Sequence, residues 1–251
     1  MTAIEAPQPA VTTAALRLDD ISAGYESTAV LHGISIEVPT GGTVALIGPN
    51  GAGKTTLLKV ASGLLRPSGG RLEVAGADVT GQRAEELARL GVCHVPEGRG
   101  VYRSLSVREN LRLQSPRGSE RDSIQRAVEV FPVLGRKLGQ TAGTMSGGEQ
   151  QMLALAAAYI RDPAVVLIDE PSLGLAPVIV DVVFESLARL ESLGTSLLLV
   201  DQFATRVLEM ASTAYVLRRG HVVYAGSSAD LLKRDLFSQY LGTEPVTAEG
   251  S

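Results

Sequence analysis

The stretch "TVALIGPNGAGKTT", residues 43–56, joins an apolar run to a glycine-rich turn and then to the start of a helical pattern. Its turn "GPNGAGKT", Gly48 to Thr55, fits the spacing G-x-x-x-x-G-K-[ST] of a phosphate-binding loop. Glycines let the backbone of such a loop wrap closely, so that consecutive N–H groups point at phosphates. An accidental glycine-rich turn is the competing interpretation. The strand before the turn and the helix after it favour the phosphate loop.

Two side chains of this loop carry chemistry of their own. Lys54 is expected to neutralise the β- and γ-phosphates of a nucleotide, and the Thr55 hydroxyl is expected to bind Mg²⁺. The predicted nucleotide-binding residues of the loop are Gly48, Pro49, Asn50, Gly51, Ala52, Gly53, Lys54, Thr55 and Thr56.

A second motif, "AVVLIDEP" at residues 164–171, places two acidic side chains at the end of an apolar strand. Asp169 is predicted to hold the hydration shell of Mg²⁺. Glu170 is predicted to polarise the attacking water as a general base. An acidic pair at a strand end is often only a helix cap, so this signal depends on the phosphate loop beside it.

A third motif, "SGGEQQ" at residues 146–151, opens another helix with small residues. Free N–H groups and the positive end of the helix dipole make such a start suited to an anion. Ser146, Gly147 and Gly148 therefore form a second candidate phosphate cradle. The alternative is a simple Gly-Gly turn before a helix.

Composition limits the classes of protein to consider. The 251 residues are 45% hydrophobic and 20% charged, and 23 basic against 27 acidic side chains give a net charge of −4. Without a basic surplus, we expect no nucleic-acid partner. Residues 1–15 are predicted to be a disordered tail without the pattern of a signal peptide. No apolar run approaches the length of a membrane span, so a membrane role would require a separate partner chain.

The rest of the pattern predicts a largely parallel sheet with helices on both faces, because strands alternate with helices along the chain. Two strands at 16–25 and 30–38 read as antiparallel and half exposed. Residues from about 98 to 145 hold two helical patterns, at 106–113 and 119–134, and are interpreted as an inserted helical subdomain. His32, His94 and His221 show no metal-ligand spacing, and they and the single cysteine, Cys93, are interpreted as structural.

Together, the motifs at residues 48–56, 145–151 ("MSGGEQQ") and 165–177 ("VVLIDEPSLGLAP") resemble the ATP-binding subunits of ABC transporters, from Leu16 onward. The resemblance implies an α/β fold with a phosphate-loop ATPase core, an N-terminal antiparallel β-subdomain and the helical subdomain, over residues 16–251. It also implies that Ser146, Gly147 and Gly148 bind the γ-phosphate held by a partner subunit. Tyr25 would stack on adenine, although a lone tyrosine is more often plain core or surface.

Four positions depart from the common pattern of that family. Glu97 replaces a glutamine that reaches toward Mg²⁺ and water, Gln202 replaces the switch histidine, and Ala176 replaces an aspartate. These three resemble the subfamily that imports branched-chain and other hydrophobic amino acids, or urea and short amides. Gln202 can still donate to the γ-phosphate and orient the water. Ala157 stands where an arginine is common and could loosen a structural ion pair.

The resulting hypothesis is an ATPase subunit at the cytoplasmic face of the membrane that binds ATP and Mg²⁺ and powers a separate permease. Lys54, Glu170 and Gln202 would be its catalytic residues. Its expected partners are transmembrane permease subunits, a second ATP-binding subunit, identical or related, and a separate substrate-binding protein. The segment "GRGVYRSLSV", residues 98–107, would receive a helix of the permease, unless its apolar side chains only pack under a loop. The alternative is a soluble regulatory ABC ATPase not coupled to transport.

Overall fold

The computed structural model describes residues 14–26, 28–98, 100–201 and 204–233 of the chain. Its first sheet is antiparallel and has the strand order β2-β1-β4-β5. These strands are β1 (Ala14–Tyr25), β2 (Thr28–Pro39), β4 (Gly69–Val74) and β5 (Ala77–Asp78). Alternate residues of β1, such as Leu16 and Leu18, are buried, which explains the half-exposed pattern predicted for this strand. The predicted antiparallel subdomain is confirmed.

The second sheet has six strands in the order β10-β9-β3-β8-β7-β6. The strands β9, β3, β8, β7 and β6 all run parallel to one another. Only β10, at one edge of the sheet, runs antiparallel to its neighbour β9. The bounds are β3 (Thr43–Ile47), β6 (Val92–Val95), β7 (Val165–Asp169), β8 (Ser196–Val200), β9 (Thr213–Arg218) and β10 (His221–Ser227). Every residue of β3, β7 and β8 is buried, as continuous apolar strands in a covered parallel sheet should be.

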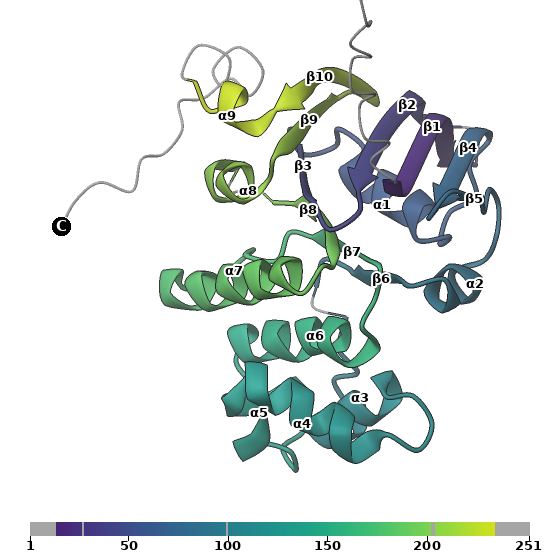
Figure 1. Ribbon diagram of the computed structural model, residues 1–251. Helices are drawn as coiled ribbons and strands as arrows, with labels where there is room; N and C mark the ends of the chain where they lie inside the picture. The colour runs from purple at the N-terminus through teal and green to yellow at the C-terminus, as the bar shows by residue number, and fades with distance from the viewer. Residues whose placement is uncertain (1–13, 27, 99, 202–203, 234–251) are drawn as a thin grey trace, which may run out of the picture.

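Helices cover both faces of this second sheet (Figure 1). α1 (Lys54–Ala61) lies between the two sheets, whereas α6 (Gly147–Arg161) and α7 (Pro177–Ser192) lie side by side on the opposite face. Shorter helices complete the fold: α2 (Ala84–Arg89), α8 (Ala204–Met210) and α9 (Ser228–Leu231). The predicted fold class is thereby confirmed.

Between β6 and α6 the chain forms α3 (Val107–Gln114), α4 (Glu120–Val130), α5 (Pro132–Arg136) and a 3₁₀ turn (Ala142–Thr144). Figure 1 shows these helices stacked below α6, away from both sheets. The second helical pattern, at 119–134, is broken in two, because Pro132 disfavours a helical backbone at Phe131 before it. The subdomain boundaries near 98 and 145 stay a prediction.

The buried strands separate two apolar clusters. Val44 and Leu46 of β3 face the cluster shared with α1 and the antiparallel sheet. Ala45 and Ile47 face the cluster shared with α6, α7 and the helical region. Because side chains alternate along a strand, the strands of this sheet contribute residues to both clusters and so hold the two halves of the molecule together. This packing also fixes the direction in which each strand ends.

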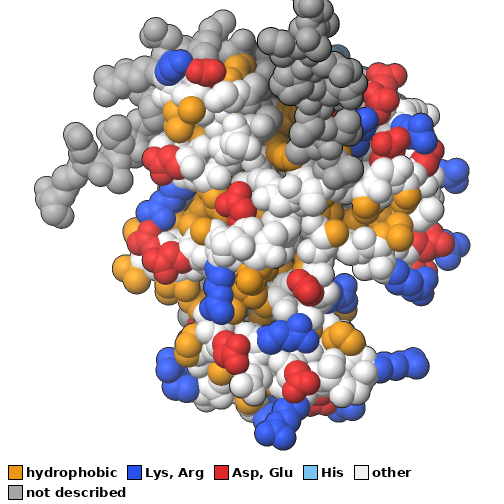
Figure 2. Space-filling view, viewed as in Figure 1, with side chains coloured by type: hydrophobic (Ala, Val, Ile, Leu, Met, Phe, Trp, Pro, Cys, Tyr) orange, Lys and Arg blue, Asp and Glu red, His pale blue; other side chains and the backbone are white. Residues whose placement is uncertain are grey.

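The surface agrees with the modest net charge. Figure 2 shows basic and acidic side chains interspersed over the face that it presents, including the helices at its lower end. Among the described residues, no helix combines the length and the apolar character needed to cross a bilayer.

Candidate functional site

The phosphate loop leaves β3 at the carboxyl end of the parallel sheet and enters α1. Gly48 has to be glycine because a Cβ there would lie 2.1 Å from the carbonyl oxygen of Leu217. Gly53 has a φ of +110°, which an L side chain rarely adopts, and a Cβ there would lie 2.8 Å from Leu31 Cδ2. Close packing on β2 and β9 therefore shapes the loop before any ligand arrives.

Lys54 is the first residue of α1 and is only 6% exposed. Its Nζ donates to the carbonyl oxygens of Gly48, 2.9 Å away, and Pro49, 3.3 Å away. A buried ammonium costs free energy unless it is hydrogen-bonded, and the loop carbonyls reduce that cost. The arrangement keeps a positive charge inside the loop where phosphates are expected.

A cavity of about 350 Å³ opens over this loop, a volume in the range of small-molecule sites. It is lined by six of the predicted loop residues and by Glu97 and Glu170, so the structure brings the phosphate loop, Glu170 of the second motif and Glu97 together at one place. Val30 of β2 and Leu173 also line it, and sequence reasoning missed both, since an apolar residue in a strand or loop carries no chemical signal. The six loop residues are Asn50, Gly51, Gly53, Lys54, Thr55 and Thr56.

Asp169 ends β7 and is 2% exposed. Burial raises the pKa of its carboxyl, Glu97 raises it further, and the nearby Thr55 hydroxyl and Lys54 lower it. Both carboxylate oxygens are buried and accept no hydrogen bond of ordinary geometry from the described part of the chain. Buried polar atoms without partners require an explanation, and a divalent cation held with Thr55 supplies one. The donor set of Thr55 and Asp169 therefore fits Mg²⁺.

Glu170 has a left-handed backbone, with a φ of +48°, and its N–H donates to the carbonyl oxygen of Val200 at 2.6 Å. Burial raises the pKa of Glu170, and the charges of Glu97, Asp169 and Asp201 raise it too, whereas Lys54 lowers it. A carboxylate with a raised pKa is a stronger base, which is what the activation of water requires.

Tyr25 lies at the end of β1 and is 43% exposed. Its hydroxyl accepts a hydrogen bond from Lys59 Nζ at 3.2 Å, and the same ammonium lies 5.4 Å from the ring centroid. Burial raises the pKa of Tyr25, but hydrogen bonds with Thr56 and Lys59 outweigh it, so the pKa falls below its usual range. The ring does not line the cavity described above, and stacking on adenine stays a prediction.

The second cradle lies at the start of α6 and does not line the same cavity. Ser146 is exposed, and its hydroxyl accepts from the N–H of Glu149 at 3.3 Å, while Glu149 accepts from the N–H of Ser146 at 3.1 Å. Gly148 is buried, and a Cβ there would lie 2.5 Å from Ile179 Cγ2 of α7. Capping and close helix packing thus account for part of this motif, and its phosphate-binding role stays a prediction.

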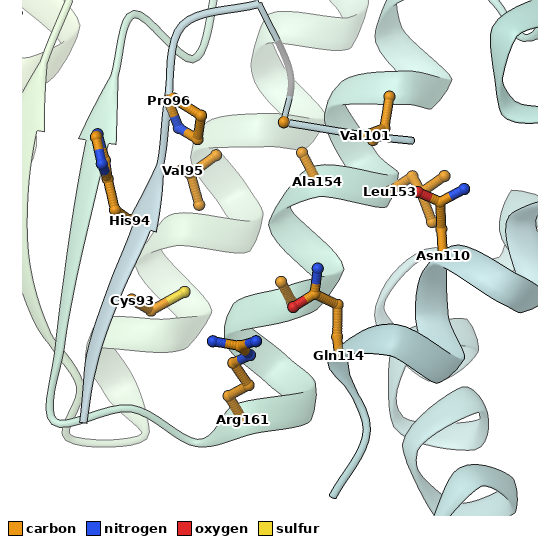
Figure 3. Close-up of a pocket in the computed structure, with 12 residues that line it drawn as sticks. Cys93, His94, Val95, Pro96, Val101, Asn110, Gln114, Leu153, Ala154 and Arg161 are labelled. Carbon is orange, nitrogen blue, oxygen red and sulfur yellow. The ribbon is translucent and has the colours of Figure 1, made fainter. Parts of the chain in front are cut away.

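The four departures fall in different surroundings. Glu97 faces the main cavity, Ala176 is the N-cap residue of α7, and Gln202 lies outside the described residues, so that its switch role stays a prediction. Ala157 lines a second cavity of about 70 Å³ between β6 and the helices α3 and α6. Figure 3 shows the Arg161 guanidinium, one turn further along α6, directed toward Cys93 across that cavity.

The histidines and the cysteine show no sign of a metal site. Among the residues that the structure describes, no group of three or more His, Cys, Asp or Glu could hold a metal ion. Cys93 is buried in β6, and burial raises the pKa of its thiol to about 11. His32 of β2 stacks on His221 of β10, with ring centroids 4.9 Å apart.

Sequence reasoning missed one polar pair next to the site. Asp201 follows β8, Ser172 lies in the turn after β7, and the two are hydrogen-bonded and buried. Both residues follow apolar strands in the sequence, so a parallel pairing of these strands was the signal that could have placed them together.

A phosphate loop, an acidic pair at the end of another strand of the same sheet and a cavity at the carboxyl edge of that parallel sheet define a phosphate-loop ATPase. A profile of the family described as ABC transporter matches residues 31–173, which is more than half of the chain. The chain therefore belongs to this family, as an ATP-hydrolysing, ATP-binding subunit.

The similarity extends to whole proteins. The high-affinity branched-chain amino acid transport ATP-binding protein BraG of Pseudomonas aeruginosa is 40% identical over 220 residues, covering 86% of this chain and 94% of BraG. A probable branched-chain amino acid transport ATP-binding protein, LivF of Archaeoglobus fulgidus, is 33% identical over 89% of this chain and 97% of its own. The crystal structure of an ABC transporter ATP-binding cassette in its ADP conformation superposes with a TM-score of 0.78 at 25% identity, covering 90% and 96% of the two chains. The resemblance to the branched-chain amino acid subfamily is confirmed.

Proposed function

We propose that this subunit hydrolyses ATP to power the import of branched-chain or other amino acids, or of urea and short amides, through a separate permease. The observation that carries the choice of substrate class is the 40% identity with BraG over nearly the full length of both chains. The cavity over the phosphate loop supports the chemistry, because it gathers a cation and two carboxylates at one place.

The proposed reaction is an in-line attack of water on the γ-phosphate of ATP. Glu170 accepts the proton of that water, and its raised pKa suits this role at neutral pH. The Lys54 ammonium exchanges its bonds to the loop carbonyls for bonds to the β- and γ-phosphates, where charge develops in the transition state. Backbone N–H groups of the loop after Pro49, up to Thr56, hold the remaining phosphate oxygens.

Mg²⁺ would be held by the Thr55 hydroxyl and, partly through water, by the Asp169 carboxylate. When bound, it would neutralise part of the negative charge on the phosphates. The support for this assignment in the structure is the pair of buried Asp169 oxygens that accept no ordinary hydrogen bond from the described residues.

The active unit is proposed to be a dimer of ATP-binding subunits around two ATP molecules. Ser146, Gly147 and Gly148 would bind the γ-phosphate in the partner's phosphate loop, which explains why these residues lie outside this chain's own cavity. The exposed position of Ser146 leaves its hydroxyl accessible to such a partner. The second subunit is identical or related, and we favour a related one.

On this proposal the subunit lies at the cytoplasmic face of the membrane, attached through permease subunits and served by a separate substrate-binding protein. The test is affinity capture of the chain from its native membrane, followed by reconstitution of the captured complex in vesicles. ATP-dependent uptake of labelled leucine, isoleucine, valine and urea is then compared. Uptake of none of them, or capture of active ATPase without a membrane-spanning partner, would favour the soluble regulatory alternative.

A further inference from the structure

The Asp201 carboxylate lies beside the site and is almost completely buried, which is rare for a charged side chain. It follows β8, is only 3% exposed and does not line the cavity over the phosphate loop. A buried charge is costly unless hydrogen bonds offset the loss of water. A buried carboxylate beside the site requires a functional explanation, and direct contact of Asp201 with the nucleotide is not that explanation.

Ser172 supplies those hydrogen bonds and is itself fully buried. The Ser172 N–H donates to Asp201 Oδ2 at 3.1 Å. The Ser172 hydroxyl lies 2.7 Å from Oδ1 and 2.6 Å from Oδ2 of the same carboxylate. Hydrogen bonds to an ionised acceptor are stronger than those between neutral groups, so this pair is a firm connection.

The connection joins the ends of two neighbouring strands. Asp169 of β7 pairs in register with Val200 of β8, and the next residue, Glu170, donates its N–H to the Val200 carbonyl. The turn then closes with the Leu173 N–H donating to the Glu170 carbonyl at 3.3 Å. Residues 170 and 172 are thus both fastened to residues 200 and 201.

Glu170 needs such fastening because its backbone is left-handed, which is unfavourable for a residue with a side chain. A conformation of this kind persists only where the surroundings over-determine it. Without the hydrogen bonds of Ser172, the turn would be free to relax, and the Glu170 carboxylate would lose its fixed direction into the cavity.

We propose that Asp201 is a positioning residue for ATP hydrolysis, which holds the turn that presents Glu170 by binding the N–H and hydroxyl of Ser172. The inference rests on the proposed role of Glu170 as general base. The charged groups that act on the carboxylates at this turn are Lys54 and Lys59 on α1, Glu97 after β6, Asp169 at the end of β7, and Asp201 itself.

The test compares the substitutions Asp201→Asn, Ser172→Ala and both together in the assembled transporter. We expect kcat for ATP hydrolysis to fall roughly 10- to 100-fold in each, as small misplacements of catalytic groups do. We expect KM for ATP to stay within about twofold, because the phosphate-binding contacts are untouched. The double variant should be no worse than the worse single one, since both changes remove the same connection.

Three further measurements separate positioning from mere stability. Asp201→Glu keeps the carboxylate and should restore most of kcat, and Asp19→Asn, at an exposed carboxylate of β1, should leave both constants unchanged. Hydrogen exchange of the backbone amides of residues 170, 172 and 173 should become faster in Asp201→Asn. If Asp201→Asn does not fold, Ser172→Ala carries the same comparison with a smaller change.

An unchanged kcat in both single variants, or a loss of ATP affinity as large as the loss of kcat, overturns the inference. Glu170→Gln distinguishes this failure from that of the underlying proposal. If Glu170→Gln is inactive while Asp201→Asn and Ser172→Ala are fully active, only the positioning role is wrong. If Glu170→Gln is fully active, the assignment of the base is wrong as well.

Discussion

The Lys54 ammonium donates to the Gly48 carbonyl oxygen at 2.9 Å, so the cation lies folded over the loop that it belongs to. The side chain is 6% exposed and lines the cavity with the rest of the loop. Phosphate oxygens entering this cavity would therefore meet a charge already in place, with little side-chain entropy left to lose.

Lys54→Ala should abolish productive nucleotide binding. Hydrogen bonds to charged groups contribute about 1.5–3 kcal/mol, so the ATP dissociation constant should rise at least tenfold. Titration calorimetry of the purified subunit measures this change, with Lys233→Ala as a control at an exposed lysine paired with Asp230. Equal ATP affinity of the Lys54 variant and the parent would show that residues 48–55 are not the phosphate-binding loop.

Glu170→Gln should keep ATP binding and lose hydrolysis. The amide has nearly the same shape but accepts no proton, and general-base catalysis contributes roughly 10²–10⁴ in rate. The variant should also accumulate as a closed, ATP-bound dimer, which size-exclusion chromatography with ATP detects. A parental rate of hydrolysis in the assembled complex would place the base elsewhere.

Ser146→Ala separates the capping role of this serine from its predicted phosphate-binding role. Ser106 is a matched control, because it caps α3 with the same Ser-x-x-Glu arrangement that Ser146 uses on α6. Each substitution should lower the free energy of unfolding by about 1 kcal/mol. Only Ser146→Ala should slow ATP hydrolysis by the dimer. Equal ATPase rates of the two variants would leave Ser146 as a cap and nothing more.

Tyr102→Asp should impair assembly with the permease while ATP binding by the isolated subunit is retained. Tyr102 is 56% exposed, and its backbone is fixed by two hydrogen bonds to the buried Asn110 side chain, at 2.8 and 3.0 Å. Leu113→Asp, at an equally exposed apolar residue of α3, is the control. Co-purification with the permease is the measurement. Parental yields for both variants would support ordinary packing under a loop.

His94 should make the subunit less stable in mild acid. Burial, with a smaller effect of Lys59, lowers the pKa of His94 to about 4, whereas the unfolded chain has the usual value of about 6.5. Between these values the unfolded state alone is protonated, so stability falls as the pH drops, by about 3 kcal/mol in all. His94→Gln should remove this part of the pH dependence in urea unfolding at pH 4–7. His32→Gln, at an exposed histidine, is the control substitution.

The sequence predicted the parts of the fold that depend on local pattern. Glycine spacing, continuous apolar runs and alternating strands identified β3, β7, the phosphate loop and the antiparallel subdomain. The acidic pair at residues 169 and 170 was predicted from its position at the end of an apolar strand, and of the two only Glu170 lines the cavity.

What the sequence did not show depends on contacts between distant residues. Ser172 and Asp201 each follow an apolar strand, but neither segment of the sequence shows that these two strands are neighbours in the sheet. The break of the second helical pattern at Phe131 was missed, although Pro132 was its visible cause. Position 148 requires glycine because Ile179 on another helix packs closely against it, and the sequence around residue 148 does not show this contact.

The strand order has a consequence for the synthesis of the protein. β3 pairs with β8 on one side and with β9 on the other, so Thr43 finds its neighbour Leu197 only near the end of translation. Long-range parallel pairing of this kind is slow, and apolar segments that wait for their partners are exposed to aggregation. The ribosome therefore releases the phosphate loop long before β8 and β9, the two strands that pair with β3, have been synthesised.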